Sequence, residues 1–85
     1  MFYLEIRILS SARAIIDRGE YDYPSESEAQ IAYKGAMDAC KLVSRITTRT
    51  LQVKLCKAKM ISTYKAQSSC IKLSEFTKGK SKELI

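Results

Sequence analysis

The side chains of this chain that could perform chemistry are mainly basic, because the usual catalytic groups are scarce. The sequence contains no histidine, so a serine or cysteine nucleophile activated by an imidazole base is excluded. A lysine base, or a cysteine acting without histidine, needs a perturbed environment that no sequence shows. We therefore expect a binding protein rather than an enzyme, and we expect no cofactor.

Ligands for a metal ion are also poorly arranged. The three cysteines, Cys40, Cys56 and Cys70, form no close pair of the kind that structural zinc sites use. The obvious carboxylates lie in the segment 17–22 beside a candidate turn, where acidic residues are common for conformational reasons. Their spacing matches no EF-hand loop. We expect no metal site.

One short segment, Gly79-Lys80-Ser81, resembles the last three residues of a phosphate-binding P-loop. That loop needs a glycine five positions earlier, where this chain has Ser74. It also needs a following helix whose N-terminus faces the phosphates, and only four residues remain. The segment therefore does not predict a P-loop.

Charge is the most informative property of the sequence. The whole chain carries a net charge of +6. Residues 1–40 have four basic and seven acidic side chains, a net −3, whereas residues 41–85 have eleven basic and two acidic ones, a net +9. Such asymmetry predicts a surface that attracts anions on one part of the fold, or attraction between the unlike halves of two copies.

The predicted anion-binding site consists of basic residues on or between the later strands, with one tyrosine that could stack on a base. Residues two apart on a strand share a face, so Lys57 and Lys59 project together. Lysine outnumbers arginine here, which favours sequence-independent phosphate contacts over reading of the bases. The competing explanation is that these lysines solvate an exposed sheet face and protect its edges. The candidate residues are Arg45, Arg49, Lys54, Lys57, Lys59, Tyr64, Lys65 and Lys72.

These observations support two hypotheses about function. The first is a non-enzymatic small binding protein whose anionic partner is nucleic acid or a nucleotide-like ligand. The alternative is a protein–protein interaction module or inhibitor that acts as a homo-oligomer, because a tiny domain gains buried surface from a second copy. Tyr3, Leu9, Tyr21 and Tyr23 are candidate interface residues, although ordinary strand packing also accounts for them.

The elements that would position these residues begin with a strand over 2–9, where apolar residues alternate with Tyr3, Glu5 and Arg7. Residues 10–23 are ambiguous. They either form a hairpin that turns at Asp17–Glu20 or start with a short helix that ends at Gly19. A long helix follows over 26–45, because Ser25-x-x-Glu28 is a capping box and the apolar residues then follow helical spacing.

The second half predicts further strands. Leu51, Val53 and Leu55 alternate with polar residues, and the segment 70–76 gives a last short strand. Residues 57–67 are either a strand after a bulge or a helix. The chain is therefore predicted to be an α+β domain, with one long capped helix packed on a small, mostly antiparallel sheet, in β-hairpin-α-β-β order.

The length and the composition of the chain indicate its domain organisation and its compartment. Eighty-five residues make one small domain, expected over 1–77, with a charged and frayed C-terminal tail over 78–85. The odd number of unclustered cysteines indicates reduced thiols, which favours the cytoplasm. The apolar start is too short and too charged to cross a bilayer, so we expect no membrane association.

Overall fold

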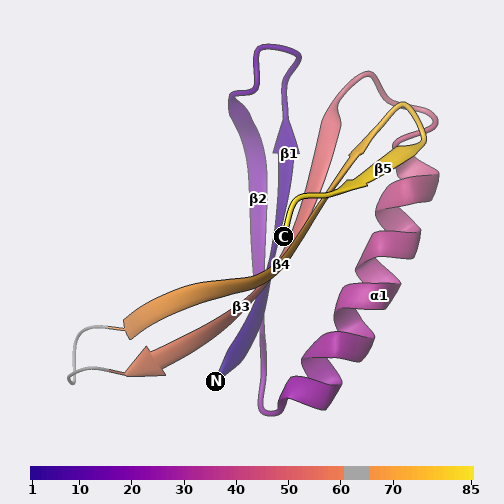
Figure 1. The fold of residues 1–85 in the computed structure, drawn as a ribbon. Helices are drawn as coiled ribbons and strands as arrows, with labels where there is room; N and C mark the ends of the chain where they lie inside the picture. Colours follow the sequence, from indigo (N-terminus) through magenta and orange to yellow (C-terminus); the bar gives the residue numbers. More distant parts are fainter. Residues whose placement is uncertain (61–65) are drawn as a thin grey trace.

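One antiparallel sheet and one helix make up the part of the chain that the computed structural model describes, residues 1–60 and 66–85 (Figure 1). The sheet has five strands in the spatial order β2-β1-β3-β4-β5. This confirms the predicted α+β class. The elements are β1 (Phe2–Leu9), β2 (Ile15–Tyr23), α1 (Glu26–Val43), β3 (Thr50–Met60), β4 (Ala66–Thr77) and β5 (Lys80–Glu83).

The core lies between α1 and one face of the sheet. Strand β1 is paired on both sides, and its alternate residues Phe2, Leu4, Ile6 and Ile8 face the helix, as the sequence predicts. The neighbouring strand β3 adds side chains to the same apolar layer under the helix. For example, Leu4 of β1 pairs with Leu55, which is fully buried. Long side chains occupy the opposite face, here called the open face.

The helix begins and ends close to the predicted positions. The hydroxyl of Ser25 accepts a hydrogen bond from the backbone N–H of Glu28 at 3.3 Å, which satisfies one donor of the first turn. Ala29, Tyr33 and Cys40 are buried against the sheet. The last turn closes when the N–H of Ser44 donates to the carbonyl of Cys40 at 2.9 Å. No helix in the described residues combines the length and apolar character that a membrane crossing requires.

Both expectations for residues 10–23 are wrong, because residues 15–23 form one strand that pairs along β1. The chain reverses earlier, at Ser10–Ala14, where Arg13 adopts a left-handed φ of 64° and its N–H donates to the carbonyl of Ser10. The glycine that suggested a turn, Gly19, lies within β2 instead, opposite Ile6. The backbone N–H and C=O groups along this edge of β1 need hydrogen-bond partners. A continuous β2 provides them, and this outweighs the local preference of Gly19 for a turn.

Strands β3 and β4 form the longest pair, and they settle part of the ambiguity over 57–67 in favour of strand. Residues 57–60 pair with residues 66–69, whereas residues 61–65 lie outside the described part of the chain. The register shift falls at Leu55/Cys56, and the extra residue is Ile71 on β4. Beyond Ala58, which bonds to Met1, the two strands continue without β1 as a two-stranded ribbon (Figure 1).

The expected tail contains a further strand. Residues 80–83 form β5, which pairs with β4 from Thr77↔Lys80 to Ser74↔Glu83. The turn between the two strands is two residues long, Lys78 and Gly79, with left-handed φ values of 54° and 78°. Such a turn matches the twist of antiparallel strands. Residues 80–83 are therefore part of the sheet.

Candidate anion-binding site

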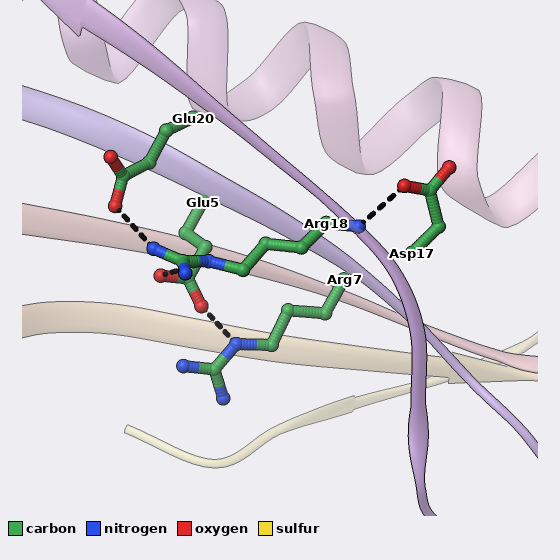
Figure 2. Close-up of polar contacts among 5 residues, drawn as sticks. All are labelled: Glu5, Arg7, Asp17, Arg18 and Glu20. Atoms are coloured by element: carbon green, nitrogen blue, oxygen red, sulfur yellow. Dashed lines mark hydrogen bonds and ion pairs between the residues drawn. The ribbon is translucent and has the colours of Figure 1, made fainter.

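On the open face, the arginines of β1 and β2 are neutralised by neighbouring carboxylates (Figure 2). Glu5 is almost fully buried, and its carboxylate lies between the guanidinium groups of Arg7 and Arg18. Arg18 also donates to Glu20 at 2.8 Å, and these contacts hold its pKa above the ordinary value. These arginines are therefore engaged by protein carboxylates rather than available to an anionic partner.

A third arginine of the first half is engaged in the same way. Arg13, in the β1–β2 turn, reaches Glu75 on β4 and donates to it at 2.7 Å. Gln52 donates to the same oxygen at 2.9 Å. The hydrogen bonds from Arg13 and Gln52 hold the pKa of Glu75 below its usual range. Within the described residues, every ion pair uses one of these three arginines and none uses a lysine.

The structure distributes the predicted site residues over four places rather than one patch. Lys54 lies on the open face, opposite Glu5 on β1. Lys57 and Lys59 lie at the start of the β3–β4 ribbon, and Lys72 lies under the helix. Arg45 and Arg49 lie in the connection between α1 and β3. Tyr64 and Lys65 fall outside the described residues.

Exposed basic residues occur on both segments where the end of α1 meets the β4–β5 turn. Two contacts join these segments. The backbone N–H of Gly79 donates to the hydroxyl of Ser44 at 3.1 Å, and a Cβ on Gly79 would lie only 3.0 Å from Cγ of Arg45. We give the name basic junction to five exposed cationic residues, each within five positions of Ser44 or Gly79 along the chain: Lys41, Arg45, Arg49, Lys78 and Lys80.

The remaining members of the basic junction are placed by neighbouring contacts. Arg49 directly precedes Thr50, whose hydroxyl lies 3.1 Å from that of Thr77, next to Lys78. Lys41 lies one turn before Ser44, which donates to its carbonyl at 2.8 Å. The segments 41–50 and 76–82 contain no acidic residue. One carboxylate lies nearby, because Glu75 lines a hollow of about 320 Å³ together with Lys78 and Lys80. Glu75 is already paired with Arg13, so the five cations of the junction leave an excess of positive charge.

Two smaller basic sites accompany the junction. A hollow of about 300 Å³ at the ribbon is lined by Lys57, Lys59, Ser68 and Ser69. The ammonium of Lys57 also lies 5.8 Å from the centre of the Phe2 ring, a cation–π distance. This hollow offers two cations and two hydroxyl-bearing residues, which suits a single phosphate contact.

The second is a groove of about 430 Å³ between α1 and the β4–β5 edge. Lys34, Lys72 and Lys82 line it, but Glu83 does so as well. The hydroxyl of Tyr33 lies 2.7 Å from that of Ser74 at its base. Burial raises the pKa of Tyr33, the Ser74 contact lowers it, and nearby Glu83 raises it further, so the phenol stays neutral. The carboxylate of Glu83 reduces the attraction of this groove for a phosphate.

This chain matches no protein-family model, no curated protein and no solved structure.

Sequence reasoning missed three members of the basic junction: Lys41, Lys78 and Lys80. The last two lie in the segment that the sequence predicts to be a frayed tail, although Gly79 between two lysines is compatible with a hairpin turn. The only sequence signal at Lys41 is a favourable charge near the end of the helix. No local signal predicts that these lysines lie beside Arg45 and Arg49.

Proposed function

We propose that this protein binds nucleic acid through the phosphate backbone, with the basic junction as its main contact surface. The observation that carries the proposal is the Ser44–Gly79 contact, which brings two acid-free segments of the chain together. Phosphates attract any exposed cation, and each neutralised phosphate releases counterions. Five exposed cations close to this contact along the chain are therefore suited to sequence-independent binding.

The distribution of paired and unpaired charge supports the same proposal. Arg7, Arg13 and Arg18 are neutralised by Glu5, Glu20 and Glu75, so the first half of the chain adds little attraction for phosphates. The basic junction contains three lysines and two arginines. Lysine is a point charge with no planar fork to read a base edge, so we expect little dependence on base sequence.

The β3–β4 ribbon is a second, smaller contact in this proposal. A two-stranded ribbon fits the major groove of B-form DNA, and Lys57 and Lys59 lie at its start. The proposal also includes a non-enzymatic role in the cytoplasm, on the grounds of composition and cysteine pattern already given.

The experiment is fluorescence anisotropy with labelled single- and double-stranded DNA and RNA of random sequence, in about 50 mM salt, where phosphate contacts are strong. The test variant is Lys78→Gln/Lys80→Gln. The control is Lys57→Gln/Lys59→Gln, which removes the same charge from residues with the same spacing on another strand. We expect the test variant to lose about tenfold or more in affinity and the control to lose less. No binding by the unchanged protein to any of the probes would refute the proposal.

A further inference from the structure

The outward face of α1 exposes large apolar side chains that the fold itself does not use. Ile31 is 75% exposed and Leu42 is 61% exposed. They are eleven residues apart, or about three helical turns, so they lie on the same side of the helix. Ala29, Tyr33 and Cys40 occupy the opposite side and pack on the sheet. A helix that only covers a sheet normally has a polar outer face.

A glycine lies between these two side chains on the same outer face. Gly35 is exposed in the middle of the helix, and a Cβ built on it would meet no atom within 4 Å. Glycine in a helix interior is less favourable than alanine, and the fold of one chain gives no reason for it here. The absence of a side chain would allow a second helix to approach closely at this point.

The charges on α1 indicate which second helix would fit. The first turn is acidic, with Glu26 and Glu28, and the last turn contains Lys41. Lys34 and Asp38 are both exposed near the middle. Two copies of α1 placed antiparallel would bring each acidic end beside a basic end. Ile31 would then lie against Leu42 of the second copy, and Lys34 beside Asp38 of the second copy.

From this complementarity we propose that two copies of this chain associate through the outer faces of their α1 helices, packed antiparallel about a twofold axis that crosses the helix at residues 36–37, beside Gly35. Such an interface is self-complementary, as a closed dimer requires. The proposal does not depend on nucleic-acid binding, but the two share Lys41, because this lysine of the basic junction would lie beside the acidic first turn of the second copy. A membrane surface would be a different occupant of the same apolar face, and the exposed carboxylate of Asp38 at its centre disfavours it.

The first test is sedimentation equilibrium of the full chain and of three charge variants. We expect the unchanged protein to reach twice its mass of 9.6 kDa at high micromolar concentration. Lys34→Asp alone and Asp38→Lys alone should each weaken self-association by about tenfold, since like charges then face each other twice per dimer. An equimolar mixture of these two variants should form a heterodimer, because both contacts then become attractive.

The heterodimer separates this proposal from a simple effect on folding. A change in the stability of one chain cannot be reversed by adding a different variant. The double variant Lys34→Asp/Asp38→Lys should also recover the dimer. Mixtures that stay monomeric, or an unchanged protein that stays monomeric at high micromolar concentration, would overturn the proposal.

A second variant tests the close approach at Gly35. Gly35→Leu should abolish the dimer while the thermal midpoint of the monomer stays the same or rises, because leucine favours helix and meets nothing in one chain. Ile15→Lys, at an exposed apolar position on β2, is the control and should leave the dimer intact. A dimer that survives Gly35→Leu would contradict the proposal. So would binding to vesicles of anionic phospholipid that depends on Ile31 and Leu42 in a monomeric protein.

Discussion

The backbone N–H of Gly79 donates a hydrogen bond of 3.1 Å to the hydroxyl of Ser44, and this contact joins the end of α1 to the β4–β5 turn. Ser44 is fully buried, and its hydroxyl also donates to the carbonyl of Lys41 at 2.8 Å. One small side chain therefore satisfies a helix carbonyl and a turn N–H at once. The arrangement of the basic junction depends on it.

Replacing this hydroxyl should weaken both the fold and the proposed site. Ser44→Ala leaves the N–H of Gly79 without its partner, and a lost buried hydrogen bond costs about 1–3 kcal/mol. We expect the free energy of unfolding in urea to fall by about that amount and nucleic-acid affinity to fall with it. Ser11→Ala, at an exposed position in the β1–β2 turn, should change neither. An unaltered urea midpoint in Ser44→Ala would show that the Ser44 hydroxyl does not stabilise the fold.

The left-handed backbone of Gly79 also restricts which residue can occupy this position of the turn. Its φ is +78°, and an added Cβ would lie 3.0 Å from Cγ of Arg45. Left-handed backbone costs a residue with a Cβ about 1–2 kcal/mol, and the Arg45 side chain would have to move. We expect Gly79→Ala to lower the free energy of unfolding by at least 1 kcal/mol. Gly35→Ala, where nothing is in contact, should instead raise it, and urea unfolding of both variants checks the contrast. Equal effects of the two substitutions would contradict this account.

The sequence predicts those elements whose pattern is local. The alternation in β1 and the Ser25 cap of α1 each lie within a few residues, and both are confirmed. The sequence does not predict β2 as one continuous strand, because Gly19 suggests a turn. In the structure the Tyr21 side chain covers Gly19, and a Cβ there would lie 3.0 Å from its hydroxyl. The actual turn uses Arg13 in a left-handed conformation, and arginine is not a residue type that signals one.

The candidate site was predictable in charge but not in position. Charge counting identifies the second half as basic, and Arg45 and Arg49 were in the predicted set. It cannot show that Arg13 is neutralised by Glu75, 62 residues later in the chain. Nor can it show that the β4–β5 turn lies against the end of α1. Both facts follow from the pairing of β3 with β1 and β4, which is a long-range property of the sheet.

The ion pair of Arg13 and Glu75 predicts a specific pH dependence. The pKa of Glu75 is lowered from 4.5 in the folded state, mainly by Arg13. A lowered folded pKa gives stability that is present above the unfolded pKa and is lost as pH falls through the folded value. Arg13→Gln should therefore lower the free energy of unfolding at pH 6–7, and the difference from the unchanged protein should shrink below about pH 4.5.

Urea unfolding across this pH range checks that prediction. Glu75→Gln provides the control, because Arg13→Gln made in that background should have little further effect on stability. A difference that stays constant down to pH 3 would mean that another group is responsible.

The buried hydroxyl of Tyr33 should also contribute to stability. It lies 2.7 Å from the hydroxyl of Ser74, which is itself almost fully buried. Tyr33→Phe removes one partner and leaves Ser74 with only a weak sulfur contact to Met37, at a cost of about 1–3 kcal/mol. Tyr21→Phe, at a half-exposed tyrosine of β2, should cost less than 0.5 kcal/mol, as is usual for surface changes (about ±0.5). Thermal unfolding of the two variants checks this prediction, and Tyr33→Phe should have the lower midpoint. Equal midpoints would contradict a stabilising role for the contact between Tyr33 and Ser74.

The salt dependence of nucleic-acid binding tests the central claim most directly. For B-form DNA the slope of log K against log salt concentration is about −0.9 for each neutralised phosphate. If all five cations of the basic junction make contact, the slope for duplex DNA should be about −4.5, and Lys78→Gln/Lys80→Gln should make it shallower by about 1.8. Lys57→Gln/Lys59→Gln should change the slope less. A slope near zero, or one that responds only to the ribbon pair, would contradict the claim that the junction of α1 with the β4–β5 turn binds phosphates.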